Sequence, residues 1–205
     1  MSSEKFKTRI FPVLFMFVIT FVFISVTTVI YTITKDKIKF NATIRFKRAV
    51  LYSADISTPE EPDKIEEIYV ERVEEIKDED GNIKYFNVYA DDLETVNANV
   101  VIKTGAGLWG EITMAVAFDS ETKSIKGVEV IDQNETPGLG GRISESWFKE
   151  QFRGKISPLT KVAEGEPAGN DQFQAVTGAT YTTNAVMDIV NLSSEEIPEI
   201  IRNYK

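Results

Sequence analysis

The 205-residue sequence contains no cysteine and no histidine. Without cysteine there can be no disulfide, no thiolate-ligated zinc and no ordinary iron–sulfur cluster. Without histidine there can be no histidine-ligated haem and no Ser-His-Asp triad. We therefore predict no metal site and no catalytic residue, and if the protein carries electrons we expect its carrier to be organic.

Basic residues are outnumbered by acidic ones, with 23 Lys and Arg against 32 Asp and Glu, a net charge of -9 and a pI near 4.7. An acidic surface repels the phosphates of nucleic acids, so these are not expected partners. Hydrophobic residues make up 42% of the sequence. This is enough to fill a core, so a folded protein is expected rather than a disordered chain.

One segment has no charged residue: IFPVLFMFVITFVFISVTTVIYTIT, residues 10–34. As a helix it would be about 37 Å long, enough to cross a lipid bilayer with some tilt. The alternative is a cleaved signal peptide, whose apolar core would be shorter, ~7–15 residues, and would end at a small-residue site. We predict a retained, single-pass membrane anchor. Lysines flank both ends, so charge alone leaves its orientation open.

Beyond the anchor the residue pattern predicts an α+β domain, an antiparallel sheet with flanking helices. In Glu111–Phe118, alternate apolar residues share one face of a strand, which is expected to be half-buried. The domains are predicted as 1–34, a cytoplasmic stub with the anchor, and 35–205, the folded body. The expected helices are 42–54 (capped by Asn41), 64–77, 145–152 and 184–191; the expected strands are 83–90, 100–103, 111–118, 125–131 and 173–176.

Residues 105–110, GAGLWG, match the G-x-G-x-x-G pattern of dinucleotide-binding folds. That pattern requires a helix directly after its loop. Here EITMAVAF follows and alternates like a strand, so a Rossmann fold is rejected. Two interpretations stay open: a glycine-rich hairpin with Trp109 in the core, or a loop whose small residues let a flat ring approach the backbone and Trp109.

Residues 135–141, ETPGLGG, form a loop by composition. Pro137 stiffens the turn, and three glycines allow close approach of the backbone to a ligand. Glu135 and Thr136 offer polar atoms, and Leu139 offers an apolar side chain. The spacing alone favours a surface turn.

Residues 177–183, TGATYTT, contain four threonines and no charge. Gly178 permits a tight backbone at the entry to a helix. Thr180 would precede the first turn, where free amides and the helix dipole attract a phosphate. The competing interpretation is that the threonines only compete to cap the helix, with Thr182 or Thr183 as the cap. The residues alone favour capping.

Taken together, ETPGLGG, Trp147 and the later TGAT resemble the FMN-binding family of membrane redox pumps. Its members include the G subunit of the Rnf complex and the C subunit of the sodium-pumping NADH:quinone reductase (Nqr). The resemblance runs from the N-terminal span through GAGLWG to the last helix. It implies that FMN is attached through its phosphate to the last threonine of TGAT, Thr180, by a flavin transferase that uses FAD and magnesium.

The resemblance also implies that the ETPGLGG loop packs on the flavin ring through Thr136, Leu139 and the neighbouring backbone. Where the family usually has Asp, three residues before TGAT, this chain has Gln174. The other residues expected at the cofactor site are Trp109, Glu135, Gly140, Lys161, Thr177, Gly178 and Ala179.

For function, the resemblance implies an electron-carrier subunit without turnover of its own, in a multisubunit complex of the cytoplasmic (inner) membrane, with its FMN domain on the extracytoplasmic side. We expect an Rnf-type complex, which couples ferredoxin:NAD oxidoreduction to Na+ or H+ translocation. The Nqr C subunit is the alternative. Two other hypotheses stay open: a flavin-free, membrane-anchored assembly module, which Gln174 favours, and a membrane-bound regulator that senses flavin.

Overall fold

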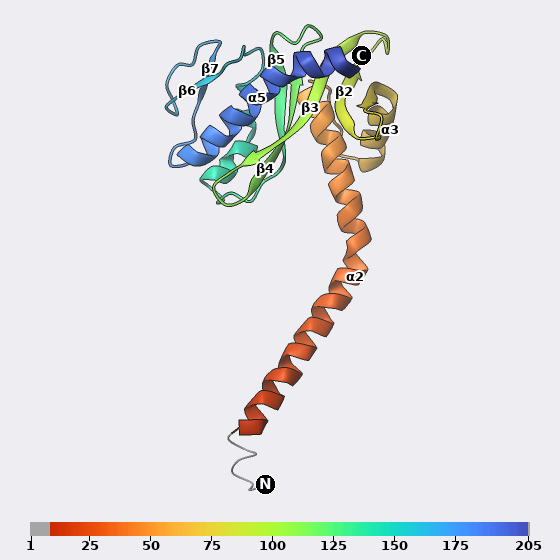
Figure 1. Cartoon of the computed structure of the whole chain (residues 1–205), viewed down its shortest axis with the longest axis vertical. Helices are drawn as coiled ribbons and strands as arrows, with labels where there is room; N and C mark the ends of the chain where they lie inside the picture. Colours follow the sequence, from red (N-terminus) through yellow and green to blue (C-terminus); the bar gives the residue numbers. More distant parts are fainter. Residues whose placement is uncertain (1–8, 205) are drawn as a thin grey trace. The chain divides into compact units, whose positions relative to one another are not determined.

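The structure is a computed structural model that describes residues 9–204 of the chain (Figure 1). It contains two compact units, one that ends at Thr43 and one that begins at Ile44. Helix α2 (Phe11–Ser53) begins in the first unit and ends in the second.

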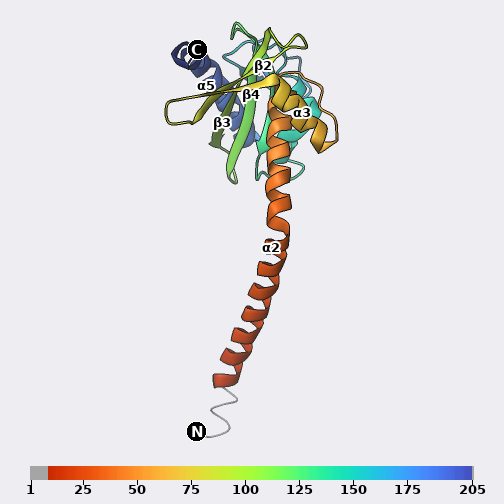
Figure 2. The ribbon, with the colours of Figure 1, turned by 90° about the vertical axis from the view of Figure 1, so that its right-hand side faces the viewer.

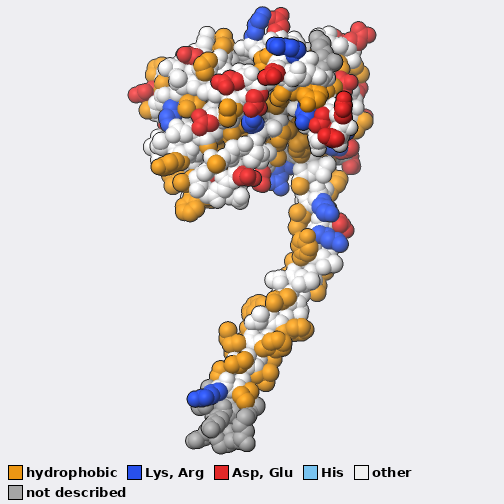
Figure 3. All heavy atoms as spheres, viewed as in Figure 1, with side chains coloured by type: hydrophobic (Ala, Val, Ile, Leu, Met, Phe, Trp, Pro, Cys, Tyr) orange, Lys and Arg blue, Asp and Glu red, His pale blue; other side chains and the backbone are white. Residues whose placement is uncertain are grey.

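In the first unit, α2 carries an apolar surface, and most of its side chains are exposed (Figure 3). Within the part of the chain that the structure describes, it is the one helix long and apolar enough to cross a membrane. Its hydroxyl groups donate to carbonyls of the preceding turn, as Ser25 does to Phe21 (2.8 Å) and Thr32 to Thr28 (2.8 Å). These hydroxyls therefore need no partner from a lipid environment.

The predicted separate helix over 42–54, capped by Asn41, is wrong, because α2 is continuous from Phe11 to Ser53. The connecting residues 35–41, KDKIKFN, contain neither glycine nor proline. Nothing local therefore interrupts the hydrogen-bond ladder, and the helix continues through the polar segment.

The predicted helix over 64–77 is wrong in its second half. Helix α3 (Pro62–Arg72) ends early, and strand β1 (Val73–Lys77) follows it directly. Strand β1 pairs antiparallel with β2 (Ile83–Tyr89) across a turn at Gly81, whose φ is +83°. Pairing with β2 outweighs the helical spacing of the apolar residues, because local propensity is weaker than tertiary pairing.

Five strands form an antiparallel sheet in the order β1-β2-β3-β4-β5. The confirmed α+β fold is thus a meander in which chain neighbours are also neighbours in the sheet. Strand β3 (Val96–Ala106) is longer than the predicted 100–103, because it stays paired with β4 (Glu111–Phe118) to the end of the hairpin. Strand β5 (Ile125–Asp132) forms the other edge.

Both faces of the sheet are covered (Figure 2). The last turns of α2 and helix α3 lie on one side, where Ala115 and Ala117 of β4 are buried. Helix α5 (Thr180–Tyr204) lies on the other, over the four alternating apolar residues of β4. Strand β4 was predicted to be half-buried, but it is buried on both faces. The prediction that its alternate apolar residues share one face is confirmed; these residues are Ile112, Met114, Val116 and Phe118.

The segment between β5 and α5 completes the second layer. It contains a 3₁₀ turn η2 (Gly140–Ser144), helix α4 (Ser146–Glu150) and the parallel pair β6 (Thr160–Val162) and β7 (Gln172–Gln174). The helix predicted over 145–152 is shorter in the structure, where it is α4. The strand predicted over 173–176 is also shorter and is β7. Helix α5 is longer than the predicted 184–191, because its apolar face continues as far as the buried Ile197.

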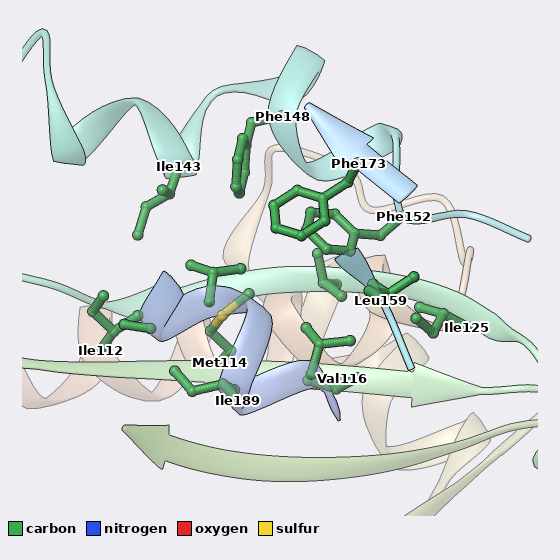
Figure 4. Close-up of a cluster of buried hydrophobic side chains, with 14 of the residues drawn as sticks. Ile112, Met114, Val116, Ile125, Ile143, Phe148, Phe152, Leu159, Phe173 and Ile189 are labelled. Carbon is green, nitrogen blue, oxygen red and sulfur yellow. The ribbon is translucent and has the colours of Figure 1, made fainter. Parts of the chain in front are cut away.

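Three phenylalanines anchor this layer to the sheet (Figure 4). Phe148, Phe152 and Phe173 are fully buried, with ring centroids 4.9 to 6.0 Å apart. They face Met114 and Val116 of β4. Because Phe173 lies in β7, just before TGAT, this cluster fixes the start of that tract relative to the sheet.

We predict that Phe173→Ala lowers the free energy of unfolding by about 3–5 kcal/mol, because it removes a buried ring and leaves a cavity. Thermal and urea unfolding of the full chain in detergent would measure this loss. The control is Val70→Ala, at a side chain that is 70% exposed, for which a change within about 0.5 kcal/mol is expected. Equal effects of the two substitutions would contradict the assignment of this core.

Candidate functional site

The carboxyl group of Glu135 joins the three loops that the sequence singles out. Its Oε1 accepts hydrogen bonds from the backbone amides of Leu108 (2.8 Å) and Trp109 (3.0 Å) in GAGLWG. Its Oε2 accepts one from the hydroxyl of Thr182 (2.5 Å) in TGATYTT. The Glu135 side chain comes from ETPGLGG and is only 5% exposed. One buried group thus holds the three tracts together.

Two glycines make room for this carboxyl group. A Cβ on Gly107 would lie 2.6 Å from Glu135 Oε1. A Cβ on Gly140 would lie 2.7 Å from Oε2 and 2.6 Å from Thr182 Oγ1. Any side chain at either position would therefore push the loops apart. The Gly107 amide also donates to the carbonyl of Gly110 (2.8 Å) in the β3–β4 hairpin, which confirms that GAGLWG is not a Rossmann loop.

The TGAT tract ends in the first turn of α5. Gly178 has a φ of +78°, a conformation that favours glycine. The first helical hydrogen bond runs from the amide of Thr183 to the carbonyl of Ala179 (2.9 Å). The amides of residues 180–182 precede this bond and have no acceptor within the helix. They and the helix dipole make this end of α5 favourable for a phosphate.

The four threonines of the tract differ in burial. Thr182 and Thr183 are buried, and their hydroxyl groups are used: the first donates to Glu135, and the second accepts from the amide of Val176 (3.2 Å). The prediction that one of them precedes the helix as its cap is wrong, because both lie inside its first turn. Thr177 and Thr180 are exposed. Among the described residues, the Thr180 hydroxyl has no hydrogen-bond partner.

Exposed apolar side chains surround this end of α5. Trp109 is 69% exposed and Tyr181 73% exposed, and Leu108 and Leu139 are also exposed. The interpretation of Trp109 as a core aromatic is therefore wrong. Leu139 reaches the TGAT backbone, since a Cβ on Gly178 would lie 3.2 Å from its Cδ2. An exposed apolar surface beside a helix N-terminus suits a ligand with a flat ring and a phosphate.

An ion pair between residues far apart in the sequence, Arg142 and Glu164, holds the first residue of TGAT. Arg142 donates two hydrogen bonds to Glu164 (2.7 and 3.1 Å), and Glu164 accepts a third from the amide of Thr177 (2.8 Å). The Arg142 guanidinium, followed by the Thr177 amide, lowers the pKa of Glu164 to about 2. Arg142 also lies over the ring of Trp147, 5.0 Å from its centroid. No local pattern in the sequence marks this pair.

Two other expected positions lie around the same tract. Lys161 of β6 donates to the Asn184 side chain of α5, so it reaches the second turn of the helix. Gln174 accepts from the amide of Gly165 (2.9 Å) and donates to the carbonyl of Glu166 (3.0 Å). It therefore holds the loop that carries Glu164. Thr136 contributes its carbonyl to the ETPGLGG turn, where it accepts from the Leu139 and Gly141 amides (3.1 and 3.0 Å).

These residues fit the phosphate and the ring of FMN. The free amides of α5 suit the phosphate, the exposed Thr180 hydroxyl suits a covalent link, and the apolar side chains around it suit the ring. Glu135 does not suit direct contact with a ligand, because it is buried and both its oxygens are used within the protein.

Comparisons with known proteins place an FMN-binding domain at residues 107–194. The C subunit of the Na+-translocating NADH-quinone reductase of Yersinia pestis is 32% identical over 104 residues, which are 47% of this chain and 39% of that protein. The G subunit of the Na+-translocating ferredoxin:NAD+ oxidoreductase complex of Acetobacterium woodii is 38% identical over 96 residues, 45% of each protein. The chain thus spans less than half the length of these relatives.

Solved structures show the same fold. The C subunit of the Na+-translocating NADH-quinone reductase from Parabacteroides distasonis superposes with a TM-score of 0.60 and 22% identity, over 81% of this chain and 96% of that one. Shewanella oneidensis NqrC superposes with a TM-score of 0.61 and 24% identity, over 75% and 93%. The resemblance to the FMN-binding family, derived from two short motifs, is confirmed.

We predict that Gly140→Ala destabilises the protein by about 1–3 kcal/mol, because its methyl group would overlap both Glu135 and Thr182. The matched control is Gly169→Ala, whose Cβ would meet nothing closer than 3.4 Å. Thermal unfolding of the full chain measures both. A neutral effect of Gly140→Ala would show that the three loops are not tightly joined.

We predict a pH-dependent effect of Glu164→Gln. The ordinary pKa of 4.5 falls to about 2 in the folded protein, because Arg142 and the Thr177 amide bind the ionised form. The stability that these two contacts give the folded protein is present above pH 4.5 and is lost as the pH falls towards 2. The variant should therefore unfold at a lower temperature than the unsubstituted protein at neutral pH, and this difference should shrink in acid.

Glu67→Gln is the control for this series, because Glu67 is exposed and forms no ion pair within residues 9–204. It should change the unfolding temperature little at any pH. A Glu164→Gln effect that stays constant from neutral pH into acid would contradict the Arg142–Glu164 interaction.

Proposed function

We propose that this chain is an electron-carrier subunit of an Rnf-type or Nqr-type complex, because its residues 107–194 match an FMN-binding domain and its relatives include the Nqr C subunit and the Rnf G subunit. The FMN is linked by a phosphodiester to Thr180. The observation that carries this proposal is the position of Thr180: it is exposed, it lies in the first turn of α5, and its hydroxyl has no partner among the described residues.

The first turn of α5 accounts for the choice of this threonine. A phosphodiester on Thr180 carries a negative charge, and the amides of residues 180–182 and the helix dipole stabilise that charge. The Thr182 and Thr183 hydroxyl groups are buried and hydrogen-bonded within the protein, so they are inaccessible to a modifying enzyme. Transfer of FMN from FAD to Thr180 Oγ by a flavin transferase would release AMP and the hydroxyl proton.

Thr180 thus acts as a tether rather than as a nucleophile in turnover. Bound FMN supplies the capacity to take up and release electrons. The protein's own residues hold it at the surface: Trp109, Leu139 and Tyr181 provide exposed apolar area, and the Glu135 hydrogen bonds keep their loops together. A surface position suits exchange of electrons with cofactors in neighbouring subunits, and a covalent link prevents loss of the exposed flavin.

Helix α2 provides the membrane attachment in this proposal. Its apolar part, which ends at residue 34, anchors the chain in the cytoplasmic membrane, and residues 35–205 form the FMN-binding body on the extracytoplasmic side. The support for anchoring is the length and hydropathy of α2. Sidedness follows from the family resemblance, since the flanking charges favour neither orientation.

Between the two complexes we favour the Rnf type, which couples ferredoxin:NAD oxidoreduction to Na+ or H+ translocation. The supporting observation is the 38% identity to the G subunit of Acetobacterium woodii, against 32% to the C subunit of Yersinia pestis over a similar length. The Nqr complex is the alternative. Mass spectrometry of the proteins that copurify with this chain distinguishes the two, because an Rnf complex contains a cysteine-rich, ferredoxin-like subunit.

We predict that Thr180→Ala abolishes covalent flavin. The full chain, coexpressed with a flavin transferase, should fluoresce under ultraviolet light on a denaturing gel, and the variant should not. Thr160→Ala is the control, because Thr160 is an exposed threonine outside the TGATYTT tract, and it should keep the fluorescent band. Peptide mass spectrometry should place the added FMN mass on residue 180.

A fluorescent band that persists in Thr180→Ala would overturn the site. A native complex that retains no flavin after denaturation would instead favour the flavin-free assembly module.

A further inference from the structure

The carboxyl group of Glu135 has an unusual electrostatic environment. Its three hydrogen-bond partners are two backbone amides and one hydroxyl, all of them neutral. Both carboxyl oxygens act as acceptors, as in an ionised carboxylate. Hydrogen bonds to a charged acceptor are strong enough to make the burial of such a group tolerable.

Within residues 9–204, no positively charged side chain forms an ion pair with Glu135. Among the ion pairs of residues 9–204, the buried Lys149 is paired with Glu129 (2.6 Å) and Arg142 with Glu164 (2.7 Å), but none includes Glu135. A carboxylate that is 5% exposed is also poorly screened by water. Its negative charge therefore acts on its surroundings more strongly than that of an exposed, paired carboxylate.

The surroundings of Glu135 are the elements proposed to hold FMN. The Trp109 amide donates to it, the Gly140 backbone lies against it, and Thr182 is two residues beyond Thr180 in the same helical turn. Every loop that contributes to the proposed flavin surface thus contacts this one carboxylate. The close approach of Gly107 and Gly140 leaves little space between the charge and these loops.

We propose that Glu135 lowers the reduction potential of the flavin carried on Thr180. Each electron that the flavin accepts adds negative charge until a proton is taken up, and a fixed negative charge in contact with the loops of the site disfavours this step. The protein environment is a known determinant of cofactor potentials. This inference rests on the proposed function, and it assigns Glu135 an electrostatic role in addition to its role in joining the loops.

The decisive variant is Glu135→Gln, which removes the charge and keeps the size. Its amide oxygen can still accept from Leu108 and Trp109, and its amide nitrogen can donate to the Thr182 oxygen. The measurement is the midpoint potential of the full-length, FMN-loaded protein in detergent, titrated with dithionite while the flavin absorbance is followed. Dithionite supplies two electrons per flavin and the buffer two protons. The potential of the variant should be higher than that of the unsubstituted protein.

A second variant keeps the charge of Glu135 and removes one of the hydrogen bonds that stabilise it. Thr182→Val removes one donor from the carboxylate, leaves its charge in place and keeps the β-branched shape. With less of its charge offset by hydrogen bonds, Glu135 should lower the potential further. This variant also decides the proposal if Glu135→Gln does not fold: a lowered potential supports it, and an unchanged potential overturns it.

Glu164→Gln is the matched control for loss of a carboxylate. Glu164 is also close to TGAT, but it is paired with Arg142 and partly exposed. Its removal should raise the potential less than Glu135→Gln does. An unchanged potential in Glu135→Gln, a rise no larger than in Glu164→Gln, or a raised potential in Thr182→Val would overturn the proposal.

The flavin-to-protein ratio separates this inference from the proposed function. If the unsubstituted chain carries no covalent flavin, the proposed function fails. If flavin is present on Thr180 in all variants but the potentials do not follow the charge, only the role of Glu135 fails. Unfolding temperatures of the apoproteins, measured in parallel, show whether any shift follows a loss of structure instead.

Discussion

The buried carboxylate of Glu135 is the interaction on which the candidate site depends. Its acceptor atoms connect Leu108, 27 positions earlier in the chain, with Thr182, 47 positions later. A buried carboxylate that lost these donors would be costly, so the three loops stabilise the charge and the charge fixes the loops. The absence of side chains at Gly107 and Gly140 follows from the same constraint, because any Cβ there would occupy the space of the carboxylate or its partners.

The rest of the fold gives this junction a rigid support. The hairpin that carries GAGLWG belongs to a sheet buried on both faces, and α5 lies across that sheet. The aromatic cluster around Phe173 fixes the approach to TGAT. The loop ends remain at the surface, and Thr180 is exposed there. In the proposed function this exposure would make Thr180 accessible to a modifying enzyme and the flavin accessible to redox partners. A deep pocket would suit the proposed role less well, because electron transfer between subunits requires close approach.

Much of the fold followed from local pattern. Hydrophobic periodicity and turn residues are properties of neighbouring residues in the chain. They predicted the apolar segment, the antiparallel hairpins and the β4 strand with its shared face from Ile112 to Phe118. Predictions failed where distant pairing decided the outcome. Residues 73–77 have helical spacing but join β2, and α5 continues past residue 191 because the core supplies contacts for its apolar face.

The residue types alone limit the possible chemistry, because the chain has no thiolate and no imidazole. One apolar segment predicts the anchor, and the presence of both ETPGLGG and a hydroxyl-rich TGAT tract indicates the FMN-binding family. The sequence could not decide which threonine is free, or that Glu135 is a buried link and Arg142 holds Glu164. Those properties arise only when residues far apart in the chain meet. Burial and hydrogen bonding make the hydroxyl groups of Thr182 and Thr183 inaccessible and leave that of Thr180 exposed. The sequence cannot show this difference, because the three residues are chemically identical.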